Sequence, residues 1–454
     1  WARNRVCGTC PRGRCDSLME EEAVVDQSLL APLRKTTWRF YALVVALLAV
    51  VGWGAYAYSW QIRSGLSVTG LTDRVSWGLY ISNMVFFIGI SYGGTLISGI
   101  LRLTHAEWRR PITRLAETTT VMALLVAVVF PVLDLGRPDR ALNLLLYRRI
   151  ESPIVWDFLG IFTYLGGALL YLYLPLIPDL GIVRREVQVG RVRGFMYRVL
   201  GGRWTGTRLQ KKSLETSIGI IAVLIIPVAI SVHTVMSWIF AMTLRSGWHS
   251  AILGPYFVAG AIFSGIAAVI IAMAIFRRVY HLEKYITVRH FRNLGALLLV
   301  LDLVVIYFTL SEYLTAAYGA ESQDVLWLKA LATGGYAYLF WLMVVGGFIV
   351  PAILLALRRT ITGIVLASVL VSVAMWLERF LIVVPTLMTP QMGSSWNLYT
   401  PSWVEWSITA AGLAGFALLC ALFSKLFPIV SMWETSEGTA PAGEPQVTEE
   451  ELPA

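Results

Sequence analysis

The chain has 454 residues, of which 57% are hydrophobic and 14% are charged, and its net charge is +9. Soluble domains are roughly 45–50% apolar and about 25% charged. The composition therefore excludes a soluble globular enzyme, a disordered protein and a disulfide scaffold, and it predicts a polytopic membrane protein. We expect no nucleic-acid partner, because the basic residues flank apolar runs.

The N-terminal segment, residues 1–37, contains three of the four cysteines, which are Cys7, Cys10 and Cys15. This C-x2-C-x4-C spacing could begin a zinc or iron–sulfur site, but no fourth ligand lies nearby in the sequence. We therefore expect a solvated segment and no metal site.

Ten apolar runs follow, each close to the 20 residues that cross a bilayer. All are rich in Leu, Ile, Val and Ala and lack strand alternation, which predicts an all-α integral membrane fold of ten transmembrane helices in the lipid bilayer. The predicted spans are 38–58, 76–101, 112–133, 153–177, 214–242, 255–276, 293–318, 334–357, 360–385 and 403–427.

The distribution of Lys and Arg between the connections predicts the orientation. On the side of the N-terminus lie 28 of these residues, against 8 on the opposite side. Cytoplasmic loops carry the excess of Lys and Arg, so both termini are expected in the cytoplasm. The tail at 433–454 has six glutamates and no Lys or Arg, and we expect it to be an acidic cytoplasmic tail.

A shift of 171 residues aligns the second span with the sixth. It matches Phe86 with Phe257, Gly89 with Gly260 and Gly94 with Gly265. We predict two four-helix bundles related by a parallel repeat, made of spans 2–5 and 6–9, with spans 1 and 10 flanking them. The predicted divisions are 38–75 for the first span and its loop, 76–242 and 243–385 for the bundles, and 386–432 for the last span.

Ionisable residues inside the spans are expected to have a structural or functional role, because a charge in hydrocarbon costs at least about 2.5–3.5 kcal/mol. Each could be a structural pair or part of a proton path. Glu378 and Arg379 are adjacent, so they project about 100° apart and each could pair with another span. Glu405 is a further candidate. The predicted proton path consists of His105, Glu107, Glu117, His233, Asp302, Glu312, Glu378 and Arg379.

The densest polar set lies in the connection between spans 3 and 4, on the outer side. Arg137 and Arg140 can form bidentate salt bridges with Asp134, Asp139 or Asp157. The set is either a salt-bridged clamp or a site that binds a polar ring and takes up its protons.

Span 2 supplies the opposite wall of such a site. Trp77, Tyr80 and Asn83 are predicted to share roughly one face near the outer surface. Ser91 and Tyr92 lie deeper, and they could continue a polar path toward the inner end of the span.

These motifs resemble the NrfD/PsrC family of membrane subunits over about residues 60–430, and they are most similar to the ActC subunit of bacterial alternative complex III. The residues that carry the resemblance are Trp77-Gly-Leu-Tyr-Ile-Ser-Asn83, Asp134-Leu-Gly-Arg-Pro138, Ser-Pro-Ile-Val-Trp-Asp157, and Ser231-Val-His-Thr234 followed by Gly247-Trp248.

The resemblance implies a quinol-binding subunit that has no redox cofactor of its own and is active only within a complex in the bacterial cytoplasmic membrane. Menaquinol is the implied substrate. An iron–sulfur subunit and haem c subunits would receive the electrons, beside a second NrfD-like membrane subunit. The alternatives are the quinone subunit of a polysulfide- or sulfoxide-reductase-type molybdoenzyme, a proton-conducting channel, and a plain anchor.

Carried onto this sequence, the resemblance implies a quinol pocket on the outer side. Tyr92 stands where a histidine is expected, which shifts the expected proton acceptor to Asp157. The implied catalytic residues are Asp157, Asp134 and Asp139. The implied quinol-binding residues are Trp77, Tyr80, Asn83, Ser91, Tyr92, Arg137, Arg140 and Trp156.

Overall fold

The computed structural model describes residues 27–34, 36–187, 190–390 and 399–437. Within these residues, ten helical segments are long and apolar enough to cross a membrane, which confirms the predicted all-α fold. They are α2 (Trp38–Ser64), α3 (Leu79–Leu103), α4 with α5 (Arg110–Ala127, Val129–Asp134), α7 (Pro153–Glu186), α9 (Arg208–Ala241), α10 (Leu253–Val279), α11 (Val288–Gly319), α13 with η5 and α14 (Ala337–Trp341, Leu342–Ile349, Val350–Leu357), α15 (Ile361–Met388) and α16 (Trp403–Leu426).

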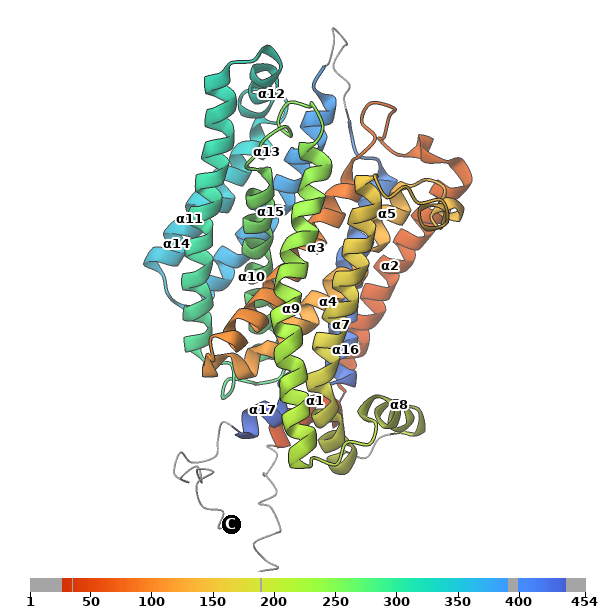
Figure 1. Ribbon diagram of the computed structural model, residues 1–454, viewed down its shortest axis with the longest axis vertical. Coiled ribbons are helices and arrows are strands. Elements are labelled where there is room, and N and C mark those ends of the chain that lie inside the picture. Colours follow the sequence, from red (N-terminus) through yellow and green to blue (C-terminus); the bar gives the residue numbers. More distant parts are fainter. Residues whose placement is uncertain (1–26, 35, 188–189, 391–398, 438–454) are drawn as a thin grey trace, which may run out of the picture.

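The short helices gather at the two ends of the bundle (Figure 1). One end carries α1 (Gln27–Arg34), α8 (Arg191–Gly201) and α17 (Met432–Glu437), and we call it the N-terminal face. The other end carries α12 (Ser322–Ala332) and the connection 135–152, and we call it the distal face. That connection contains the short helices η4 (Pro138–Arg140) and α6 (Asn143–Leu146).

Several helices extend beyond the predicted apolar runs. Helix α7 continues to Glu186 rather than 177, and α9 begins at Arg208 rather than 214. The added residues are mostly polar, so a scan for apolar runs passes over them although their backbone stays helical. Trp77, predicted inside the second span, lies before α3, which begins at Leu79.

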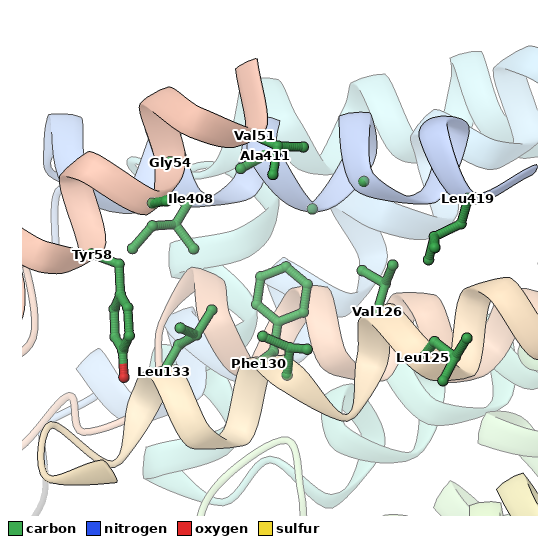
Figure 2. A pocket seen from close by; sticks show the side chains of 14 residues that line it. Val51, Gly54, Tyr58, Leu125, Val126, Phe130, Leu133, Ile408, Ala411 and Leu419 are labelled. Carbon is green, nitrogen blue, oxygen red and sulfur yellow. The ribbon is translucent and has the colours of Figure 1, made fainter. Parts of the chain in front are cut away.

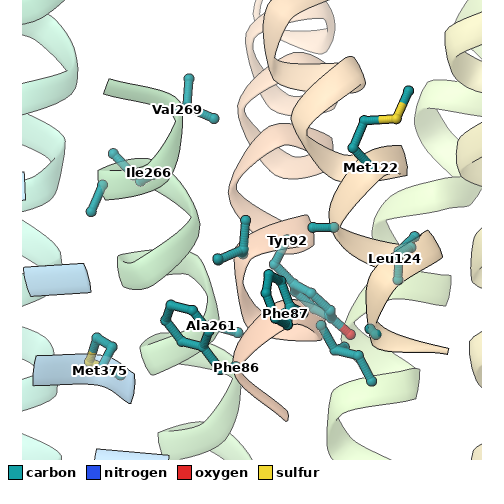
Figure 3. Packing of buried hydrophobic residues seen from close by; sticks show 14 of the residues in the cluster. Phe86, Phe87, Tyr92, Met122, Leu124, Ala261, Ile266, Val269 and Met375 are labelled. Carbon is teal, nitrogen blue, oxygen red and sulfur yellow. The ribbon is translucent and has the colours of Figure 1, made fainter. Parts of the chain in front are cut away.

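Helix α3 lies at the centre of the bundle and packs between α4 and α10 (Figure 3). Twenty of its residues are buried, so it is the helix least exposed to lipid. At its crossing with α10, a Cβ on Gly93 would lie 2.0 Å from the carbonyl carbon of Gly265. Only paired glycines allow two backbones to approach this closely. The parallel repeat that relates these two spans stays a prediction.

The C-terminal segment folds back over the N-terminal face. Glu434 of α17 pairs with Arg102 and, at 3.2 Å, with Arg109. Asp179 of α7 pairs with Arg114 of α4 at 3.1 Å, and both side chains are fully buried. Asp179 also accepts hydrogen bonds from the backbone N–H groups of residues 432 and 433. Buried charges are thereby paired across three separate segments.

Candidate functional site

A polar cluster joins α2, α3 and α5 at the distal face. The hydroxyl of Tyr80 donates to Gln61 at 2.6 Å, and the amide of Gln61 donates to the carbonyl of Leu133 at 2.9 Å. Asp134, the last residue of α5, follows at once. Its Oδ1 is buried and has no hydrogen-bond partner among the described residues. Such an orphaned acceptor is unusual, because buried polar atoms are normally hydrogen-bonded.

A second carboxylate beside this cluster is fully satisfied by the protein. Glu405 accepts hydrogen bonds from the N–H groups of Gly70 at 2.7 Å and Ser402 at 2.9 Å, and from the hydroxyl of Tyr399 at 2.5 Å. With Ser402 it forms the capping box that begins α16. Glu405 therefore has a structural role, one of the two roles expected for it, and ties the 65–78 connection to α16.

An apolar groove of about 290 Å³ lies between α2, α16 and the α4–α5 segment, and its lining includes Tyr58 and Leu133, the residue before Asp134. Figure 2 shows Tyr58 at one end of the groove opposite Leu133, and Leu419 toward the other end. The groove is shaped by small residues, since a Cβ on Gly54 would lie 2.2 Å from Ala411 and one on Gly412 would lie 2.6 Å from Phe130. Its volume lies at the lower limit for small-molecule sites.

Asp157 lies on α7, on the side of α3 that faces α9. The residue is 8% exposed, and its Oδ1 has no hydrogen-bond partner among the described residues. It interacts electrostatically with Tyr92, whose hydroxyl contacts the Ala229 carbonyl and accepts from the backbone N–H of His233. The rings of Tyr92 and His233 are 4.3 Å apart. Asp157 and Asp134 are thus two separate buried carboxylates.

The connection 135–152 is more open than the sequence suggested. Arg137 pairs with Asp139 at 3.1 Å, and both side chains are exposed. The hydrogen bond from Arg137 holds the pKa of Asp139 below its usual range. Arg140 is exposed, and Trp156 is exposed with its indole donating to the Ile150 carbonyl at 2.7 Å. The expected arginine pairing therefore forms with Asp139, whereas Asp134 and Asp157 form no salt bridge within the described part of the chain.

Tyr80 and Asn83 share a face of α3 that points to the packed pair α2 and α16, whereas Trp77 departs from it, so the expectation of one shared face was wrong for Trp77. Trp77 packs edge-on against Phe240 at 5.6 Å, toward α9. Asn83 instead donates to Thr409 of α16 at 2.8 Å, and Tyr80 points to α2. The cause is that Trp77 precedes the helix, so helical spacing does not relate it to the other two.

A column of hydroxyl groups runs through the first half of the bundle from Ser91 toward the N-terminal face. Tyr164 donates to the Ser91 carbonyl at 3.1 Å and lies 2.8 Å from the Thr95 hydroxyl. Farther on, Ser98 lies 2.8 Å from a carboxylate oxygen of Glu117 and 2.9 Å from the Tyr171 hydroxyl. These hydrogen bonds join side chains of α3, α4 and α7 in two successive groups.

The other predicted path residues fall into two groups. His105 and Glu107 are exposed at the N-terminal face, where Glu107 pairs with Arg110 at 2.6 Å. The remaining residues, apart from His233 on α9, are in the second half of the bundle. Glu378 and Arg379 pair with each other at 2.9 Å rather than with other spans, and the guanidinium lies 4.8 Å from the Phe257 ring.

Asp302 and Glu312 complete this half, whereas His233 lies on α9 in the first half. Asp302 is fully buried, and neither carboxylate oxygen has a hydrogen-bond partner among the described residues. Glu312 accepts from Ser250 at 2.5 Å. His233 is fully buried, and neither ring nitrogen has a hydrogen-bond partner in the described part of the chain.

Sequence reasoning missed Gln61 and Tyr58, which form the α2 side of the Asp134 cluster. Gln61 lies beyond the predicted end of the first span, and Tyr58 looks like an ordinary interfacial aromatic residue. The available signal was that a glutamine followed an apolar run within one helical turn.

Comparisons with known proteins agree with this architecture. The model of the family described as "Polysulphide reductase, NrfD" matches residues 67–391. The chain belongs to the NrfD family. The resemblance seen in the sequence motifs is thus confirmed at the level of the family, and the chain is a multi-pass integral membrane protein.

Relatives in this family are membrane subunits of oxidoreductase complexes. The chain is 32% identical to a putative dimethyl sulfoxide reductase membrane subunit of Halobacterium salinarum, over 74% of each chain. It is 24% identical to an Hdr-like menaquinol oxidoreductase integral membrane subunit of Archaeoglobus fulgidus, over 86% of this chain and 94% of the relative. It is 23% identical to a menaquinone reductase integral membrane subunit of Nitratidesulfovibrio vulgaris, over 86% and 92%.

Proposed function

We propose that this chain is the quinol-binding membrane subunit of a respiratory or photosynthetic electron-transfer complex of the alternative complex III type. It oxidises menaquinol near the distal face, which lies on the outer side of a bacterial cytoplasmic membrane. Iron–sulfur and haem c partner subunits receive the electrons, and a second NrfD-like subunit lies beside it. Protons released at the site leave on the outer side and contribute to a gradient.

The observation that supports this proposal is the apolar groove whose wall includes Tyr58 and Leu133, because Leu133 directly precedes the orphaned carboxylate of Asp134. A menaquinol has an isoprenoid tail and a ring with two hydroxyl groups. The groove walls suit the tail, and the cluster of Tyr58, Tyr80 and Asp134 suits a hydroxyl of the ring. The names of the A. fulgidus and N. vulgaris relatives support menaquinol as the quinol.

Oxidation of the ring releases two protons and two electrons. The electrons leave to the partner subunits, and each proton needs an acceptor within hydrogen-bond reach. Asp134 and Asp157 each offer a buried carboxylate oxygen that no described side chain uses. We assign the first proton to Asp134, which directly follows Leu133 of the groove wall, and the second to Asp157.

The assembled complex provides the test, through quinol-driven reduction of its haem partners. Asp134→Asn and Asp157→Asn keep the shape of each side chain but remove the proton acceptor, so each is expected to lower the rate at least tenfold, since general bases contribute about 10²–10⁴-fold. Asp73→Asn is the matched control, because Asp73 is an exposed carboxylate near the distal face. If both buried variants keep the rate of the control, the assigned site is wrong.

The second candidate is the quinone subunit of a sulfoxide- or polysulfide-reductase-type molybdoenzyme. The name of the H. salinarum relative favours it. The quinol site is the same in both candidates, and the electron acceptor differs. Mass spectrometry of the proteins that co-purify with the chain separates them, because a molybdopterin protein supports the second candidate and haem c proteins support the first.

A further inference from the structure

Three metal-ligand side chains meet at the distal face in the second half of the bundle. His249 comes from the turn between α9 and α10, Glu321 precedes α12, and Asp324 lies in the first turn of α12. One nitrogen or carboxylate oxygen from each lies within 4.8 Å of the other two. The Nε2 of His249 is 3.7 Å from the Oδ2 of Asp324.

The turn that presents His249 is held firmly in place. Gly247 has a φ of +82°, and a Cβ there would lie 2.4 Å from the ring of Trp327, so no side chain fits. The buried indole of Trp248 donates to the Ile382 carbonyl of α15 at 2.7 Å. His249 is therefore fixed next to α12 before any ligand arrives.

One ring nitrogen of His249 is already engaged. Its Nδ1 lies 2.8 Å from the Arg245 carbonyl. A carbonyl can only accept, so Nδ1 carries the hydrogen, and in the neutral ring Nε2 keeps a lone pair directed toward Asp324. Metal-binding histidines show the same arrangement, in which a backbone carbonyl fixes the tautomer and the orientation of the ring.

The carboxylates around His249 carry more negative charge than its single imidazole can offset. Asp324 is 9% exposed, and its Oδ1 has no hydrogen-bond partner among the described residues. Glu312 of α11, held by Ser250, interacts electrostatically with both His249 and Asp324. Uncompensated buried carboxylates are costly, and a cation would offset that cost.

We propose that His249, Glu321 and Asp324 bind a divalent transition-metal ion, with Zn²⁺ as the best match. One imidazole nitrogen and two carboxylate oxygens suit zinc, which water completes to four ligands. Glu321 is exposed on a long side chain, so it can close the gap by rotating. The bound ion cross-links the turn at 245–250 to α12. This site is separate from the quinol site and does not depend on it.

Zinc binding to the purified full chain tests this proposal. Cys7, Cys10 and Cys15 are replaced by serine in every sample, so that their thiols contribute no metal. The chain is stripped with EDTA, equilibrated with Zn²⁺, and analysed for bound metal and for its thermal midpoint. We expect one zinc per chain and a higher midpoint. Co²⁺ is used as a second probe, because its visible absorption reports a low-symmetry site.

Two variants and a matched control decide the outcome. His249→Asn and Asp324→Asn are each expected to lose the bound zinc and the rise in midpoint. His281→Asn replaces an exposed histidine at the N-terminal face, where φ is +53° and asparagine is tolerated, and it should keep both. The proposal is overturned if the parent binds no zinc, which leaves a His249–Asp324 ion pair only, or if His249→Asn binds as much zinc as His281→Asn.

Discussion

Replacing Gly93 by alanine perturbs the contact between the two halves of the bundle. The added Cβ would lie 2.0 Å from the carbonyl carbon of Gly265, 2.4 Å from its Cα and 2.4 Å from the nitrogen of Ile266. All three atoms are backbone, so no side chain can turn away. Ordinary contact begins near 3.4 Å, and α3 and α10 must therefore separate locally by 3.4 minus 2.0, or about 1.4 Å.

The free-energy cost follows from that separation. Overpacking a filled core costs about 1–3 kcal/mol, and a clash between two backbones belongs at the upper end. We expect Gly93→Ala to lower the free energy of unfolding by about 3 kcal/mol. For a chain of this length, the thermal midpoint should fall by roughly 3 °C. Thermal denaturation in detergent measures the shift.

Gly166 of α7 is the matched control, because a Cβ there meets no atom within 4 Å. Gly166→Ala should leave the midpoint unchanged or raise it slightly, since alanine favours a helix interior over glycine by about 0.5–1 kcal/mol. An equal midpoint for Gly93→Ala and Gly166→Ala would refute the close crossing of α3 and α10.

Two further variants test the buried charges. Arg114→Leu leaves Asp179 without its cation and should lower the free energy of unfolding by about 3–5 kcal/mol, while adding Asp179→Leu should restore most of the thermal midpoint. A double variant as unstable as the single one would contradict the ion pair. Glu405→Ala removes the acceptor for two backbone N–H groups and one hydroxyl, each worth about 1–3 kcal/mol, so limited proteolysis should cut the 65–78 connection faster. Unchanged cleavage there would count against its clamping role.

The ten spans were predictable because each is a long apolar run, and the bilayer leaves few other structures for such a run. The helix ends were less predictable. Asp179 and Arg114 lie near these ends, and their pairing depends on a contact between α4 and α7 that no local pattern encodes.

The candidate site was only partly predictable, for a similar reason. Asp134 and Asp157 stand out as carboxylates beside apolar runs. The role of Gln61 depends on α2 reaching α5, which is a tertiary contact. Helical spacing predicted that Glu378 and Arg379 project apart and pair with other spans. They pair with each other instead, because the long side chain of Arg379 can reach its neighbour in sequence. His249 and Asp324 are likewise brought together only by the fold.

The Glu434 contacts at the N-terminal face have a consequence for biogenesis. Glu434 follows Arg102 by 332 residues, so during synthesis the helices that carry Arg102 and Arg109 enter the membrane long before their partner exists. Glu434 can neutralise their charges only after α17 has left the ribosome. Synthesis of α17 is therefore also the step that closes this face of the bundle, and a nascent chain that stalls after α16 would leave these arginines without Glu434.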